Sequence, residues 1–177
     1  MEECVRPNLL QRFILCTDGT VTRILEDFAG EPVLVCKLRE EMVKATSPAH
    51  LLDMSEPESV LVRNVLLQGA RTGRKFIYAE SLLRTDALTP ELLDALCTTD
   101  IPLGLLLREW RFETFRELVA SSTEEAGDWA AHFGVHPKAV ALSRTYRVVW
   151  SQRPAMLITE KFPVAGELQG PPTKAKR

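Results

Sequence analysis

The sequence lacks any run of about 18 consecutive apolar residues, the length that a membrane-spanning helix needs, which excludes a membrane span. It also lacks a secretory signal, because Glu2 and Glu3 stand where a basic stretch and an apolar run would be needed. We therefore expect a cytoplasmic protein that does not associate with membranes.

Paired cysteines are absent as well. The four cysteines lie far apart and form no CxxC pair: Cys4, Cys16, Cys36 and Cys97. This spacing favours reduced thiols that serve in packing or lie on the surface, and it disfavours a disulfide framework or a zinc site.

Motifs for metals, phosphates and covalent nucleophiles are missing too. His132 and His136 have the spacing of a helical metal pair, but Gly134 and Pro137 would break that helix and no HExxH motif surrounds them. The segment 69–75 superficially resembles a phosphate loop, yet it joins two expected strands. No GxSxG or Cys–His arrangement occurs. We expect a protein without a metal ion or cofactor.

The charge is nearly balanced, with 22 Lys and Arg against 24 Asp and Glu and a net charge of −2. No basic face of the kind that a phosphate backbone requires is present, so a small molecule is a better candidate partner than nucleic acid. A chain of 177 residues suits one globular domain. We assign residues 1–165 to that domain and expect residues 166–177, with two prolines and three basic residues, to be disordered.

Hydrophobic periodicity and capping residues divide the chain into helices and strands. Helices are expected at 9–15, 21–28 (begun by Thr20 and ended by Gly30), 90–99 and 100–110. Strands are expected at 33–45, 59–67, 75–81, 111–119, 139–150 and 155–163, with a loop at 46–57 and a polar segment after 119. Because adjacent strands are joined by short turns, the pattern predicts an antiparallel sheet covered by helices, an α+β fold.

Two charged residues fall within apolar strands. Alternation places Glu160 on the same face as Met156, Ile158 and Phe162, and Arg63 on the same face as Leu61, Val65 and Leu67. A buried charge costs several kcal/mol unless it is paired. The pair could form a structural salt bridge, either side chain could reach the sheet edge, or a pocket could hold an anion against Arg63.

The helix start expected at Asp100 is a second candidate anion site. The first backbone N–H groups of a helix lack partners within it and carry the positive end of its dipole. Gly104 would allow a ligand to come close to this backbone.

Several segments resemble the chorismate pyruvate-lyase family, and most closely its actinobacterial, cyanobacterial and archaeal branch. They are Asp18–Glu26, Val60–Arg63, Tyr78–Ser81, Thr99–Gly104, Glu113–Glu117, Ser143–Val148 and Arg153–Pro163. The resemblance extends over about residues 10–163, in the order that the family has.

The resemblance implies a six-stranded antiparallel sheet with helices on one side and an internal ligand cavity. It also implies conversion of chorismate to 4-hydroxybenzoate and pyruvate without metal or cofactor. Arg63 would hold the ring carboxylate together with backbone amides at Leu103 and Val21. Glu160 would contact the ring hydroxyl, either as a general base or by holding it while the hydrogen passes internally to the leaving group.

Chorismate carries a second carboxylate, for which Arg144 is our candidate and Arg116 and Arg147 are the alternatives. Two other functions stay open: a related lyase that gives another benzoate isomer, and a non-catalytic module that binds small aromatic acids, as in the effector domains of bacterial transcription regulators. The chain has no additional helix-turn-helix segment, which disfavours a complete regulator. We expect a monomer.

Overall fold

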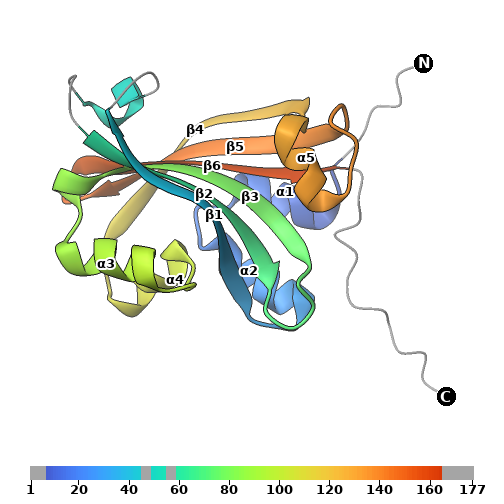
Figure 1. Cartoon of the computed structure of the whole chain (residues 1–177), viewed down its shortest axis with the longest axis horizontal. Helices are drawn as coiled ribbons and strands as arrows, with labels where there is room; N and C mark the ends of the chain where they lie inside the picture. The colour runs from blue at the N-terminus through green and yellow to red at the C-terminus, as the bar shows by residue number, and fades with distance from the viewer. Residues whose placement is uncertain (1–6, 45–48, 55–58, 165–177) are drawn as a thin grey trace.

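The computed structural model describes residues 7–44, 49–54 and 59–164 (Figure 1). The helices are α1 (Leu9–Cys16), α2 (Val21–Ala29), α3 (Pro90–Thr98), α4 (Leu103–Glu109) and α5 (Ala130–Phe133), with 3₁₀ turns η1 (Ala49–Leu52), η2 (Thr85–Ala87) and η3 (Gly127–Trp129). The strands are β1 (Val33–Lys44), β2 (Ser59–Gly69), β3 (Lys75–Arg84), β4 (Thr114–Glu125), β5 (Val140–Trp150) and β6 (Arg153–Pro163). The predicted tail at 166–177 and parts of the predicted loop at 46–57 lie outside the described residues.

The six strands form one sheet in the order β1-β2-β3-β6-β5-β4, and every neighbouring pair is antiparallel. The β2–β3 and β5–β6 hairpins therefore form its centre, and β1 and β4 form its edges. The predicted α+β fold with six antiparallel strands is confirmed.

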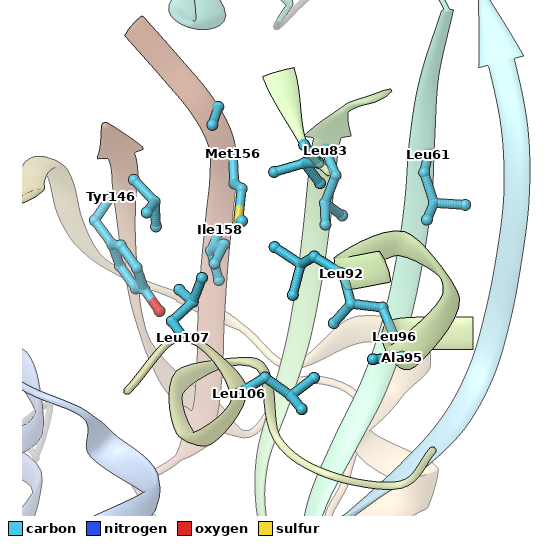
Figure 2. Close-up of a cluster of buried hydrophobic side chains, with 13 residues drawn as sticks. Leu61, Leu83, Leu92, Ala95, Leu96, Leu106, Leu107, Tyr146, Met156 and Ile158 are labelled. Carbon is cyan, nitrogen blue, oxygen red and sulfur yellow. The ribbon is translucent and has the colours of Figure 1, made fainter. Parts of the chain in front are cut away.

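Helices α1 to α4 lie on one face of the sheet, as predicted (Figure 1). Figure 2 shows how leucines of α3 and α4 reach the strands, with Leu92, Leu96, Leu106 and Leu107 directed toward Leu61, Leu83, Met156 and Ile158. A second cluster joins Ile14 of α1 and Val21 and Leu25 of α2 to the other end of the same face. None of the helices in the described ranges is long and apolar enough to cross a membrane.

The helix predicted to begin at Asp100 instead begins at Leu103, with Pro102 at the N-cap position. Proline disfavours helical geometry in the residue before it, here Ile101, so the helix cannot extend back through it. The carbonyl of Asp100 accepts a hydrogen bond from the Val35 amide at 2.9 Å, which joins this loop to β1. The free backbone amides of this helix therefore lie at Leu103 and not at Asp100. Anion binding at this helix start stays a prediction.

Strand β4 was predicted at 111–119 but runs from Thr114 to Glu125. Arg111 adopts a left-handed backbone conformation (φ 57°) that ends α4 in a turn. Residues 120–125, which are polar apart from Ala120, pair with β5 at the sheet edge, where both faces of the strand are largely exposed. An edge strand of this kind shows no apolar alternation, which is why its second half was not predicted.

The polar segment after β4 also contains η3 and α5, which were not predicted. Their buried residues Trp129 and Ala130 contact Leu66 and Tyr78 on the face of the sheet opposite to α1–α4. In Figure 1, α5 accordingly lies on the other side of the strands.

Candidate active site

A cavity lies between the first turns of α2 and α4 and the sheet face beneath them. It is lined by Thr20, Val21, Thr22, Pro102, Leu103, Gly104 and Leu107 from the helices, and by Val35, Arg63, Val65, Leu67, Ala79, Ser81, Arg116, Tyr146, Val148, Ile158 and Glu160 from the sheet. The lining combines apolar side chains with the charged groups of Arg63, Arg116 and Glu160, as small-molecule sites commonly do.

Gly104 lets the two helix starts come together at this cavity. A Cβ atom on Gly104 would lie 2.7 Å from Thr20 Cγ2, closer than two such carbons can come. The side chain of Thr20 makes no capping hydrogen bond to α2. The first amides of α2 and α4 therefore border the same space, and Val21 and Leu103, both predicted as backbone contacts, line it.

Arg63 lines the cavity and is 4% exposed. Its Nε donates to Glu40 Oε1 at 2.6 Å, and its Nη2 donates to the carbonyl of Leu96 at 3.1 Å. Nη1 has no acceptor among the described residues. The guanidinium group is thus held from two sides and keeps one nitrogen for a ligand.

Glu160 lines the same cavity and is 6% exposed. Arg144 Nε donates to its Oε2 at 2.8 Å, and the Tyr146 hydroxyl donates to its Oε1 at 3.0 Å. Arg144 Nη1 also donates to the carbonyls of Ile14 and Thr17, the latter at 2.7 Å. The carboxylate is therefore held by β5, and through Arg144 it is connected to the end of α1.

Tyr146 lies between two arginines. The guanidinium carbon of Arg144 is 5.1 Å from its ring centre, and that of Arg116 is 5.8 Å away. Burial raises the pKa of the Tyr146 hydroxyl well above its usual range, and the neighbouring Glu160 carboxylate adds to this effect. The hydroxyl thus stays a hydrogen-bond donor.

Arg63 and Glu160 do not form the salt bridge considered from the sequence, since each has another partner. They lie on β2 and β6, with β3 between them. Neighbouring strands are about 4.8 Å apart, so these two backbones are separated by about 10 Å. Both side chains line one cavity, from strands that are two places apart in the sheet.

The three arginines considered for a second carboxylate occupy different places. Arg144 does not line the cavity but holds Glu160, as described above. Arg147 is on the other face of the sheet and pairs with Glu117 at 2.6 Å. Arg116 lines the cavity, and its Nη1 donates to the carbonyl of Asp18 at 2.9 Å.

Arg116 also carries an unsatisfied donor. Within the described part of the chain its Nε is buried without a hydrogen-bond partner. Such a donor is costly unless a ligand or a water meets it.

Glu40 and Tyr146 were not assigned a role from the sequence. Tyr146 lies in a segment that carries the family resemblance, but alternation alone gave no reason to expect its contact with Glu160. Glu40 lies in a run of charged residues on an edge strand, typical of a solvated surface. Their roles depend on partners distant in the sequence, which no local pattern reveals.

Metal ligands do not gather in the described residues: no group of three or more His, Cys, Asp and Glu side chains is found there. His132 stacks on the ring of Tyr78 at 6.3 Å, on the face opposite to the cavity. That the protein works without a metal ion or cofactor stays a prediction.

The sequence model of the family described as chorismate pyruvate-lyase Rv2949c-like matches residues 15–169. The chain belongs to this family. The family resemblance predicted from the sequence, and with it membership in a family of lyases, is confirmed.

Curated relatives agree with this assignment. The chain is 29% identical over 153 residues to the chorismate pyruvate-lyase of Mycobacterium leprae, covering 85% of this chain and 72% of that protein. It is 30% identical over 160 residues to the chorismate pyruvate-lyase of Mycobacterium tuberculosis strain H37Rv, covering 85% and 78%.

Solved structures with the same fold include transcription factors. The effector domain of PhnF from Mycobacterium smegmatis has a TM-score of 0.63 at 14% identity, covering 82% of this chain and 88% of that domain. A GntR-family transcriptional regulator from Bacillus cereus has a TM-score of 0.58 at 8% identity, covering 78% and 96%. At these identities the likeness concerns the fold alone.

Proposed function

We propose that this protein converts chorismate to 4-hydroxybenzoate and pyruvate, without a metal ion or organic cofactor. The observation that carries the proposal is the position of Arg63 and Glu160, which face one cavity from two strands of the sheet. The relatives named chorismate pyruvate-lyase support the choice of substrate.

A para-substituted ring suits this arrangement. The ring carboxylate lies against Nη1 of Arg63, a charge-assisted contact of the kind that guanidinium groups make well. The amides of Val21 and Leu103 are placed to add hydrogen bonds to the carboxylate. The ring hydroxyl, at the opposite end, donates to Glu160.

Arg116 takes the second carboxylate, the one on the enolpyruvyl group. Its buried, unsatisfied Nε and its place in the cavity lining favour it over Arg144, whose donors already hold Glu160 and the end of α1. The guanidinium contact with Tyr146 fixes the direction from which Arg116 meets the ligand.

The reaction needs orientation more than chemical assistance, because aromatisation of the ring drives it. The bond between the ring and the enolpyruvyl oxygen breaks, and the hydroxyl-bearing carbon loses its hydrogen. We propose that this hydrogen passes directly to the methylene carbon of the departing enolpyruvyl group, which becomes the methyl group of pyruvate. Glu160 holds the hydroxyl throughout, and no group has to carry a proton between the two carbons.

Incubation of the chelator-treated protein with chorismate tests the reaction itself. We expect pyruvate and 4-hydroxybenzoate in equal amounts by chromatography, and none from the Arg63→Ala variant. A folded wild-type protein that binds 4-hydroxybenzoate but releases no pyruvate would contradict the proposal, and would favour a binding module instead. A different benzoate isomer would contradict the para geometry alone.

The same reaction in D₂O tests the internal hydrogen transfer. Pyruvate can be reduced to lactate as it forms, which prevents later exchange of its methyl hydrogens. Direct transfer predicts no deuterium in the lactate methyl group by mass spectrometry. If Glu160 acts as a general base, the enolpyruvate takes its proton from exchangeable sites and one deuterium appears.

A further inference from the structure

Strand β1 contains a β-bulge beside the cavity. Lys37 is opposite Val65 of β2 and Arg39 is opposite Asn64, so Leu38 is an extra residue without a partner in the ladder. A bulge of this kind shifts the alternation of side chains by one residue, and bulges near functional sites commonly redirect a side chain.

The shift decides which charge faces Arg63. Without the extra residue, Arg39 would take the place opposite Arg63; with it, Glu40 does. Arg39 then lies with Asn64 on the other face of the sheet. The bulge therefore replaces a like charge beside Arg63 with an opposite one.

The side chain of Glu40 is partly buried and lies between two basic residues. Its Oε1 accepts the hydrogen bond from Arg63 Nε at 2.6 Å, and its side chain is only 21% exposed. Lys37, which donates to the carbonyl of Cys97 at the end of α3, is 3.8 Å from Glu40 Oε2. The carboxylate thus has a fixed place directly behind the guanidinium group that faces the cavity.

A fixed anion behind Arg63 has two opposing effects on a ligand carboxylate. It orients the guanidinium group, which favours binding. It also neutralises the charge of Arg63 and repels a second carboxylate that comes close in surroundings of low polarity, where such repulsion is stronger than in water. The hydrogen bond supplies the first effect and the negative charge supplies the second, so a substitution can separate them.

We propose that Glu40 is the resident counter-ion of Arg63, a positioning residue whose negative charge lowers the affinity of the cavity for the product carboxylate. This inference rests on the proposed function, because it takes Arg63 as the residue that binds the ring carboxylate. In the unliganded protein Glu40 satisfies the buried arginine, and the ligand shares that arginine with it.

The Glu40→Gln variant tests the inference, since glutamine keeps an acceptor for Arg63 Nε and removes the charge. Isothermal titration with 4-hydroxybenzoate should show binding about tenfold tighter than in the wild type, equivalent to about 1.4 kcal/mol. A role in structure alone predicts the reverse, because a disturbed Arg63 would bind the carboxylate less well. Glu40→Ala removes the charge and the acceptor together, so its affinity for 4-hydroxybenzoate should lie below that of Glu40→Gln.

Glu41→Gln is the matched control. Glu41 is the next residue on β1, lies opposite Val62 and pairs with Arg39, away from the cavity. The substitution changes the net charge by the same amount, and binding should match that of the wild type.

The outcomes separate the two proposals. If the wild type produces 4-hydroxybenzoate but Glu40→Gln does not bind it more tightly than the wild type, the counter-ion inference is wrong and the proposed function stands. If the wild type neither turns over chorismate nor binds 4-hydroxybenzoate, the proposed function fails, and the counter-ion inference fails with it.

Discussion

The two faces of the sheet hold similar side chains and use them differently. Each has one of the two tyrosines of the chain, and both tyrosines are 7% exposed. On the face covered by α5, the Tyr78 hydroxyl accepts a hydrogen bond from Asn64 at 2.9 Å. On the face covered by α1–α4, the Tyr146 hydroxyl donates to a buried carboxylate.

The charged residues differ in the same way. On the α5 face, Lys161 lies 3.6 Å from Glu80, whose side chain is 43% exposed. On the cavity face, Arg63, Arg144 and Glu160 are almost fully buried, at 2–6% exposure. Water stabilises the exposed pair, whereas the buried charges depend on partners within the protein. The α5 face also has a buried charge, Arg84 at 4% exposure, but Arg84 pairs with Asp86 and with the carbonyl of Leu52. Buried charges that line a cavity are what distinguish the other face.

Substitution of a glutamate on each face should give the largest difference in activity between the faces. Glu160→Gln should lower kcat/KM for chorismate about 100-fold, because the ring hydroxyl loses a buried, charged acceptor. Glu80→Gln should leave the rate within about twofold, because it changes a half-exposed pair on the other face. Pyruvate release measures both. Equal rates for the two variants would contradict the assignment of the site to the cavity face.

Arginines on the two faces give the next comparison. Arg116→Met should raise the KM for chorismate about tenfold by removing the contact to the second carboxylate. The affinity for 4-hydroxybenzoate, which has no second carboxylate, should stay unchanged in titration calorimetry. Arg147→Met is the control from the α5 face. A parallel loss of substrate and product affinity in Arg116→Met would place this residue at the ring carboxylate instead.

Removal of the hydroxyl group from each of the two equally buried tyrosines should give a smaller difference in kcat. Tyr146→Phe removes one hydrogen bond to Glu160 and should lower kcat about tenfold with little change in KM, since net hydrogen bonds to charged groups contribute about 1.5–3 kcal/mol. Tyr78→Phe removes one hydroxyl from an equally buried ring and should leave kcat unchanged. Steady-state kinetics measure both variants. Equal kcat values for Tyr146→Phe and Tyr78→Phe would refute the role of Tyr146.

The smallest expected effect concerns the stability of the folded protein at alkaline pH. An unfolded tyrosine ionises near pH 10, while burial keeps Tyr146 protonated in the folded protein because its pKa is raised. The unfolded state therefore releases a proton that the folded state keeps, and stability that is fully present below pH 10 is lost as the pH rises above it.

Urea unfolding at pH 8 and pH 10.5 measures this effect. The loss of unfolding free energy should be smaller in Tyr146→Phe than in the wild type. Burial, followed by the effect of Glu80, raises the pKa of Tyr78 to about 12, so Tyr78→Phe should also reduce the loss. An unchanged pH dependence in Tyr146→Phe would contradict the buried, protonated state.

Much of the fold could be predicted from local patterns. Alternation along β2 and β6 placed Arg63 and Glu160 on their correct faces, because both strands are central and one side of each meets helices. Thr20 and Gly30 marked the ends of α2, where Gly30 takes the left-handed conformation that ends a helix.

The errors fall where local patterns and tertiary contacts disagree. β4 lies at an edge, so its outer half has no apolar face to reveal it. The bulge at Leu38 shifts the alternation of side chains along β1 by one residue. No glycine in the strand marks its position, so the sequence did not reveal it. The partners of Arg63 and Arg144 come from other strands and helices, so spacing along the chain gave the candidate residues but not their pairing.

A structure with bound 4-hydroxybenzoate would test the central claim most directly. The account predicts the ligand in the cavity between α2, α4 and the sheet, with its carboxylate on Arg63 and its hydroxyl on Glu160. A ligand bound on the α5 face, or one turned so that its hydroxyl meets Arg63, would contradict it.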